Sequence, residues 1–128
     1  MKKLLLISTL FLLITTIFAS EPIVSTNLNI KVLETTQDSV KIALLWDHDG
    51  ANTTHYLMYG RNESSSYSVV GNIDVALPRE FEITLKKGFI YYFRVTAVNN
   101  IGESNPSNEV VFDANPPATP TGLRVERR

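Results

Sequence analysis

Residues 90–99 read Ile-Tyr-Tyr-Phe-Arg-Val-Thr-Ala-Val-Asn, and this stretch decides the fold class. Successive side chains of an extended chain point to opposite faces, so alternate residues share a face. One face carries Tyr91, Phe93, Val95 and Ala97, and the other carries Tyr92, Arg94, Thr96 and Val98. Apolar residues that recur with period two indicate a β-strand with one buried face. We therefore expect a central strand here, with the first set in the core.

A second stretch, Ser39–Asp47, shows the same alternation and predicts another central strand. Its expected core face carries Val40, Ile42, Leu44 and Trp46, and its outer face carries Lys41, Ala43, Leu45 and Asp47. Weaker strand patterns cover residues 28–32, 55–60, 67–72, 79–85 and 109–112. The inward residues of these weaker strands are expected to include Tyr56, Met58, Phe81, Ile83 and Leu85.

Turn-forming residues separate these patterns at intervals of roughly eight to twelve residues, which is typical of sandwiches and barrels of short strands. No segment shows the period of an amphipathic helix. Seven strands without a covering helix must bury their apolar faces against another sheet. The sequence therefore predicts an all-β, seven-stranded, immunoglobulin-like β-sandwich over residues 20–114.

The run from Leu85 to Asn99, followed by Gly102-Glu103-Ser104, resembles the closing half of a fibronectin type III domain. That family has a leucine, a short turn, a tyrosine six residues after the leucine, and then an alternating strand that ends in asparagine. Trp46 is similar to the family's core tryptophan, and Tyr56 to the aromatic residue that opens its third strand. One departure is Lys87, where the family often has proline, so the turn before Tyr91 is expected to be less rigid.

Tyr91 is expected to place its ring in the core while its hydroxyl bonds a backbone carbonyl upstream, in the arrangement known as a tyrosine corner. Trp46 supplies the largest single core side chain. The predicted structural core comprises Trp46, Tyr56, Leu85, Tyr91, Phe93 and Val95. We expect these residues to determine the fold and to have no direct functional role.

Residues 1–19 have the pattern of a secretory signal peptide, with Lys2 and Lys3 ahead of an apolar run and the small Ala19 before the cut. The apolar run of roughly 15 residues is shorter than the ~20 that a membrane span needs. An uncleaved membrane anchor is the alternative. The sequence thus predicts a secreted protein, or a periplasmic or cell-surface one in a bacterium, that meets the membrane only through the signal peptide before cleavage.

Composition argues against several classes of function. The 128 residues include 12 Lys and Arg against 13 Asp and Glu, without a basic cluster, so no nucleic-acid partner is expected. The absence of cysteine excludes disulfides, thiolate metal sites and a cysteine nucleophile. We expect no cofactor.

No catalytic or metal-binding pattern is convincing. Asp47-His48-Asp49-Gly50 faintly resembles a calcium loop, but Met58 occupies the position that requires a bidentate glutamate. Glu80 and Glu82 alternate with apolar residues and belong to a solvent face, and His55 has no serine or aspartate partner at an interpretable spacing. The sequence thus predicts a protein that is not an enzyme.

Two loops, residues 47–54 and 99–105, are the candidate binding loops, because irregular connections on a rigid scaffold are where such folds bind partners. The candidate residues are Asp47, His48, Asp49, Asn99, Asn100, Ile101 and Glu103. The second loop lacks the Arg-Gly-Asp tripeptide with which some family members bind integrins. The alternative interpretation is that both loops are ordinary solvated turns.

Two functions remain open: a module that binds an extracellular or cell-surface protein or glycan, for instance in adhesion, and a structural spacer or assembly subunit without a ligand. Residues 115–128 form a proline-rich linker and tail whose end resembles the opening strand of a further repeat. The tail is expected either to be disordered or to self-associate, with Leu123 and Val125 adding as a strand to another copy or a partner.

Overall fold

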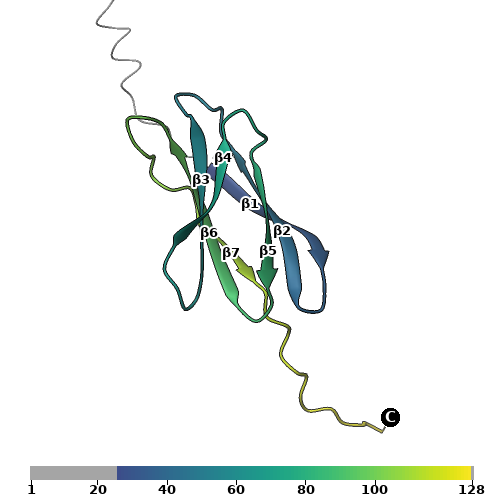
Figure 1. Cartoon of the computed structure of the whole chain (residues 1–128). Helices are drawn as coiled ribbons and strands as arrows, with labels where there is room; N and C mark the ends of the chain where they lie inside the picture. Colours follow the sequence, from purple (N-terminus) through teal and green to yellow (C-terminus); the bar gives the residue numbers. More distant parts are fainter. Residues whose placement is uncertain (1–25, 128) are drawn as a thin grey trace, which may run out of the picture.

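The structure is a computed structural model that describes residues 26–127. It contains seven strands in two packed sheets and confirms the predicted all-β sandwich (Figure 1). The strands are β1 (Thr26–Thr35), β2 (Ser39–Asp47), β3 (His55–Asn62), β4 (Ser68–Asp74), β5 (Glu80–Lys86), β6 (Ile90–Val98) and β7 (Val110–Asp113). One sheet has the order β1-β2-β5 and the other has the order β4-β3-β6-β7.

Both strands with the strongest alternation lie inside a sheet, as expected. β2 pairs with β1 on one side and β5 on the other, and β6 pairs with β3 and β7. All of these pairings are antiparallel. An interior strand makes ladder hydrogen bonds on both sides, so it can also present its apolar face fully to the opposing sheet.

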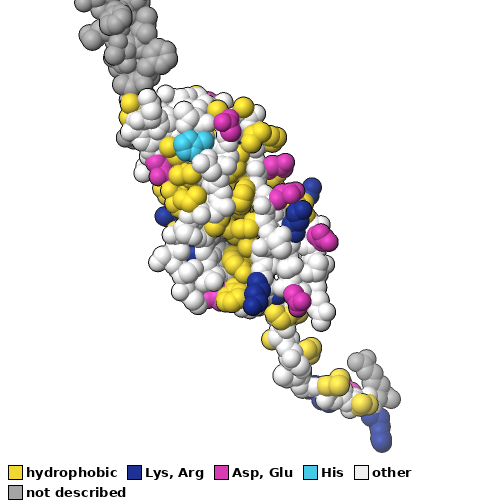
Figure 2. Space-filling model, viewed as in Figure 1, with side chains coloured by type: hydrophobic (Ala, Val, Ile, Leu, Met, Phe, Trp, Pro, Cys, Tyr) yellow, Lys and Arg dark blue, Asp and Glu magenta, His cyan; other side chains and the backbone are white. Residues whose placement is uncertain are grey.

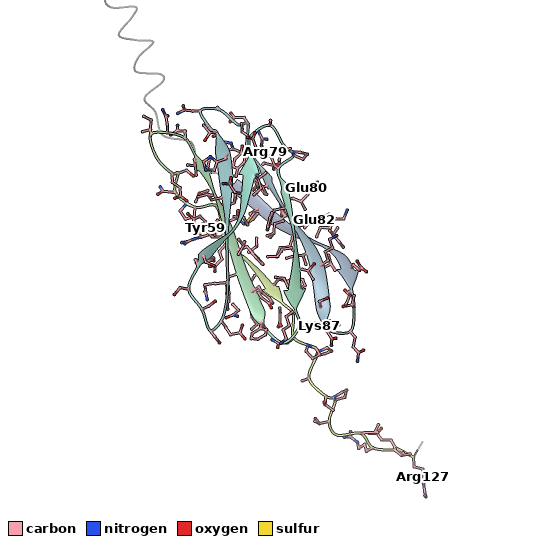
Figure 3. The ribbon with its side chains drawn as sticks, in the orientation of Figure 1. Tyr59, Arg79, Glu80, Glu82, Lys87 and Arg127 are labelled. Atoms are coloured by element: carbon pink, nitrogen blue, oxygen red, sulfur yellow. The ribbon has the colours of Figure 1, made fainter. Side chains whose placement is uncertain are left out.

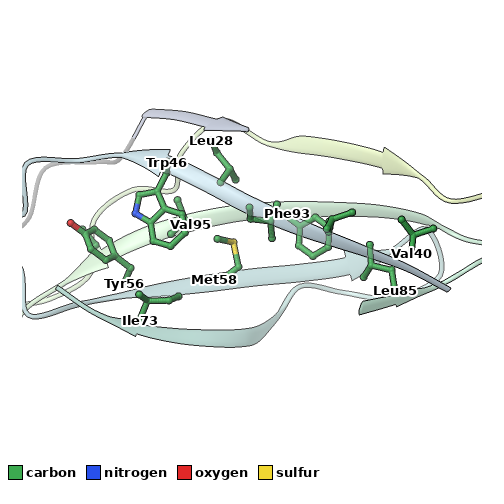
Figure 4. Close-up of a cluster of buried hydrophobic side chains, with 12 residues drawn as sticks. Leu28, Val40, Trp46, Tyr56, Met58, Ile73, Leu85, Phe93 and Val95 are labelled. Atoms are coloured by element: carbon green, nitrogen blue, oxygen red, sulfur yellow. The ribbon is translucent and has the colours of Figure 1, made fainter. Parts of the chain in front are cut away.

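The core lies between the two sheets (Figure 4). Tyr56, Val95 and Phe93 are at most 1% exposed, and Trp46 and Leu85 are 4% exposed. The Trp46 and Tyr56 rings meet edge to face with centroids 5.5 Å apart. Such contacts add about 0.5–1.5 kcal/mol to the gain from burying the aromatic surface.

Tyr91 forms the tyrosine corner that the sequence predicts. Its hydroxyl donates a hydrogen bond of 2.7 Å to the carbonyl oxygen of Lys86. The absence of proline at position 87 also has a structural reason. The backbone N–H of Lys87 donates to the carbonyl of Asp38 over 3.0 Å, and a proline has no N–H to make this bond.

The structure differs from the expected strands mainly at their ends. β1 spans ten residues instead of five, because two irregularities in its pairing with β2 let the chain stay extended beyond its apolar centre. β4 begins and ends later than expected, at Ser68 and Asp74. Ala43 and Thr96 point to outer faces as predicted, yet they are only 3% and 4% exposed, because larger neighbours cover these small side chains.

The predicted signal peptide, residues 1–19, lies outside the described residues. Within residues 26–127 there is no helix with the length and apolar character to cross a membrane. After β7 the chain leaves the sandwich as an extended tail (Figure 1).

Candidate functional site

The outer face of the four-stranded sheet carries two tyrosines and two arginines on neighbouring strands. Because Tyr56, Met58, Phe93 and Val95 turn into the core, the residues between them point outward. In the register of β3 with β6, Tyr59 lies opposite Arg94 and Arg61 lies opposite Tyr92. Each arginine is therefore directly across from a tyrosine on the next strand.

Tyr67, in the connection before β4, completes a stack in which tyrosine rings and guanidinium groups alternate. The Arg61 Cζ lies 3.9 Å from the centroid of the Tyr92 ring and 5.3 Å from that of Tyr67. The Arg94 Cζ lies 4.1 Å from the Tyr67 centroid and 5.9 Å from that of Tyr59. We call these five residues, in the order Tyr92, Arg61, Tyr67, Arg94 and Tyr59, the Tyr–Arg ladder.

Two carboxylates accept hydrogen bonds from the hydroxyls of two of the three ladder tyrosines, Tyr59 and Tyr67. Tyr59 donates to Glu103 Oε2 over 2.5 Å, and the same oxygen accepts from Thr96 Oγ1 over 2.6 Å. Tyr67 donates to Glu109. Burial, and after it the hydrogen bond with Glu109, raises the pKa of Tyr67 from 10.0 to about 12. Hydrogen bonds as well as stacking thus hold Tyr59 and Tyr67 in place.

The guanidinium groups of the ladder keep donors that the described part of the chain does not use. Among residues 26–127, the ion pairs are Lys41 with Glu82 and Arg124 with Glu126, so neither ladder arginine has a carboxylate partner there. The buried Nε of Arg94 also has no hydrogen-bond acceptor within those residues. A guanidinium that is stacked but not ion-paired can bind a carboxylate or a carbonyl of a partner.

Exposed valines flank the ladder on the same face. Val69 of β4 pairs with Tyr59 and is 52% exposed, and Val111 of β7 pairs with Tyr92 and is 54% exposed. This face therefore combines apolar surface with aromatic and guanidinium groups across the sheet.

The two candidate loops meet at one end of the sandwich. The side-chain amide of Asn99 donates to the carbonyl of Asn52 over 2.8 Å, and the N–H of Thr54 donates to the carbonyl of Val98 over 2.8 Å. Ile101 is 49% exposed at the tip, beside the exposed Asn100. Glu103 lies apart from this tip, because its carboxylate bonds the ladder.

Asp47 and Asp49 are exposed, but His48 differs from the solvated turn residue that the sequence suggested. It is half-buried, its Nδ1 lies 2.8 Å from the Tyr56 hydroxyl, and the same atom accepts from the N–H of Gly50 over 3.0 Å. The His48 and Tyr56 rings also meet edge to face. The chain reverses after Asp47, so His48 packs against Tyr56. The local sequence pattern does not predict this contact.

Arg79 also contacts both Tyr56 and His48 at this end of the molecule. Its Cζ lies 5.0 Å from the Tyr56 centroid, and its Nε donates to the carbonyl of His48 over 3.4 Å. Contacts of His48 with Tyr56 and Arg79 therefore hold the loop of residues 47–54 against the sandwich.

Catalytic or metal-binding groups do not gather in the described residues. No group of three or more His, Asp or Glu side chains there could hold a metal ion. Glu82 pairs with Lys41 at 3.4 Å on the solvent face, and Glu80 is exposed. His55 Nδ1 lies 2.8 Å from Oγ1 of its neighbour Thr54.

The alternation in residues 90–99 predicts Tyr92 and Arg94 on the outer face but does not by itself predict the ladder. A signal was present: Tyr59-Gly60-Arg61 and Tyr92-Phe93-Arg94 share the spacing Tyr-x-Arg. Two such triplets on adjacent antiparallel strands set each tyrosine opposite an arginine when the register is right. Tyr67 had no such signal, since it reaches the ladder from a loop.

Residues 24–113 match the sequence model of the fibronectin type III domain. The chain belongs to this family. Fibronectin type III domains are generally binding or spacer modules without catalytic activity. No curated protein matches the chain.

Several solved structures share this fibronectin type III fold at low sequence identity. The fourth such domain of a human protein has 18% identity and a TM-score of 0.59, over 81% of this chain and 88% of that one. A domain of human collagen XX has 18% identity and a TM-score of 0.54, over 71% and 88% of the two chains. A beta-1,2-glucanase from Parabacteroides distasonis has 24% identity and a TM-score of 0.52, over 78% of this chain but 14% of the glucanase.

Proposed function

We propose that this fibronectin type III chain is a secreted, non-catalytic module that binds a protein partner through the outer face of its four-stranded sheet. The observation that carries the proposal is the Tyr–Arg ladder with its flanking valines. Tyrosine and arginine are enriched among the residues that dominate protein–protein binding energy. Here they are already ordered by stacking and by Glu103 and Glu109, so binding costs little conformational entropy.

We favour a protein over a glycan as the partner because guanidinium groups already lie over the tyrosine rings. Two guanidinium groups, those of Arg61 and Arg94, lie over the ring of Tyr67. Tyr92 and Tyr59 each have an arginine on one face. Sugar rings commonly stack on open aromatic faces, whereas the guanidinium donors and exposed valines of this surface suit carboxylates, carbonyls and apolar side chains of a protein.

A spacer is the second candidate, and the positions of the first and last parts of the sandwich along the chain favour it. β1 begins at Thr26, which pairs with Asp47, at the end of the sandwich that carries the candidate loops. The tail follows Ala114, which bonds Gly88 at the opposite end. A chain that enters at one end and leaves at the other (Figure 1) can link neighbours in a row.

The test measures binding of the purified protein to arrays of extracellular proteins and of purified polysaccharides. We expect a protein ligand whose affinity falls by about tenfold or more in the double variant Arg61→Ala/Arg94→Ala. The matched control, Lys31→Ala/Lys86→Ala, removes two exposed cations elsewhere and should bind like the wild type. If polysaccharides alone bound in a way that depends on the ladder, the partner would be a glycan and not a protein. If no ligand depended on the ladder for binding, the spacer function would be favoured over the binding function.

A further inference from the structure

We propose that the tail of one copy, residues 122–126, adds as a strand to the free edge of β5 in a second copy. Leu123 and Val125 then lie in the groove beside that edge. The contact is separate from the Tyr–Arg ladder: Tyr59 and the β5 glutamates lie on opposite sides of the sandwich (Figure 3). It therefore does not depend on the proposed binding function.

The outer edge of β5 offers unused backbone groups. β5 pairs only with β2 among the described strands. The N–H of Trp46 donates to the carbonyl of Arg79 over 3.2 Å, so these two residues form a hydrogen-bonded pair between β2 and β5. In an antiparallel ladder the hydrogen-bonded pairs alternate, so the backbone N–H and C=O groups of Glu82 and Thr84 point away from β2. Such an edge is a template for an added strand.

A groove of about 390 Å³ lies beside this edge, between β4 and β5. Its apolar lining comes from Ile73, Leu77, Pro78 and Phe81, and Glu80 and Glu82 also line it. The Phe81 ring lies against Gly71 of β4, where a Cβ atom would be 2.6 Å from the ring. Figure 2 shows hydrophobic side chains along the middle of this face.

The tail has the pattern of a strand that lacks a partner. Leu123 and Val125 are 101% and 98% exposed, and they alternate with Arg124 and Glu126. Period-two alternation suits a strand with one apolar face. In the described residues, the backbone of residues 116–127 makes no hydrogen bond. Docking would supply partners for these backbone groups and cover both side chains.

Charge complementarity supports the pairing. Once Leu123 and Val125 face the groove, Arg124 and Glu126 point to the same outer side of the strand pair as Glu80 and Glu82, and there Arg124 can exchange its ion pair with Glu126 for one with a β5 glutamate. Both glutamates are exposed, and opposite charges across paired strands stabilise them. The tail adds a further cation, Arg127, next to this segment.

The groove is expected to hold the tail of a second copy, because the tail of each copy begins at the other end of β5. It leaves the sandwich near Lys87, after the far end of β5, and extends away from the domain (Figure 3). The groove lies toward Leu77 and Pro78, before the start of β5. Prolines 116, 117 and 120 favour an extended tail over a reversal. A head-to-tail contact of this kind can repeat along a row of copies.

The test combines sedimentation velocity with amide hydrogen exchange on the purified protein, from micromolar to millimolar concentration. We expect the average mass to rise with concentration while the amides of residues 122–126 become protected in parallel. The variant Leu123→Asp/Val125→Asp should associate at least about tenfold more weakly, because it places charges in an apolar groove. The control Ala118→Asp/Thr119→Asp adds the same charge outside the segment and should associate like the wild type.

A charge exchange checks the register without touching the apolar contacts. Glu82→Arg and Arg124→Glu should each weaken self-association, and an equimolar mixture of the two single variants should restore it. A monomer at every concentration would overturn the proposal, and so would association that the tail variants leave unchanged. Protection of residues 122–126 that does not vary with concentration would show docking on the same copy and would equally overturn it.

Discussion

At the scale of single residues, two polar contacts decide how the aromatic core is held. The Tyr91 hydroxyl ties β6 to the end of β5 through the carbonyl of Lys86. His48 covers Tyr56, whose pKa is raised above 10.0, mainly by burial. Each contact lets a tyrosine ring enter the core without leaving its hydroxyl unbonded, which would cost about 1–3 kcal/mol.

Replacing Tyr91 by phenylalanine should lower the free energy of unfolding by about 1 kcal/mol, since the ring remains and one hydrogen bond is lost. Urea denaturation measures this. The adjacent Tyr92→Phe is the matched control. The Tyr92 hydroxyl has no hydrogen-bond partner in the described residues, so its loss should change stability by less than about 0.5 kcal/mol. Equal effects of the two variants would contradict the tyrosine corner.

The structure changes the expectation for His48. A solvated turn residue would tolerate alanine within about 0.5 kcal/mol. Because His48 bonds Tyr56 and Gly50, we expect His48→Ala to cost about 1–2 kcal/mol. His55→Ala is the control, since the Nδ1 of His55 bonds only the adjacent Thr54 in an exposed position. A thermal melt that ranks His55→Ala as the more damaging variant would show that the His48 contact does not stabilise the fold.

At the scale of strands, the ladder depends on register as much as on sequence. A shift of one residue between β3 and β6 would turn Tyr59 and Arg61 toward the core and break every stack. The pairing irregularity between Met58 and Tyr59 on the β4 side sets where Val69 lies beside the ladder. The stacks and the two tyrosine–glutamate bonds therefore also help to fix the pairing of this sheet.

Alkaline pH should weaken the ladder through Tyr67. Its pKa is raised to about 12 in the folded chain from 10.0, first by burial and then by Glu109. A raised pKa means that the stabilisation is fully present below pH 10 and is lost as the pH rises toward about 12. Denaturant melts across this window should show a smaller loss of stability for Tyr67→Phe than for the wild type. Identical pH profiles would exclude a contribution from this hydroxyl.

The sequence predicted the strands well because period-two alternation is a local signal. Ser39–Asp47 was found with its observed bounds, and the strand at Ile90–Val98 was found to within one residue. Strand ends were less predictable, since pairing irregularities extend β1 beyond its apolar centre. The place of Tyr67 in the ladder and the packing of His48 over Tyr56 could not be predicted from the sequence, because both depend on loops whose path is set by the whole sandwich.

At the scale of the whole molecule, three surfaces lie apart from one another. The ladder covers the outer face of one sheet, the loops of residues 47–54 and 99–105 form one end, and the β5 edge lies beside the groove. Among the surfaces of residues 26–127, the ladder face is the one that combines ordered aromatic rings, guanidinium donors without ion pairs to those residues, and exposed valines. We expect the module to bind its partner through this face.

The most direct test is to map the contact by the amide chemical shifts of the isotope-labelled protein, titrated with the protein ligand that the binding array identifies. We predict that the largest changes fall at Tyr59, Tyr92, Arg94 and Val111, with little change at Asn100, Ile101 and Glu82. Changes concentrated at the end loops or along β5 would contradict the account, because they would assign binding to a different surface of the same sandwich.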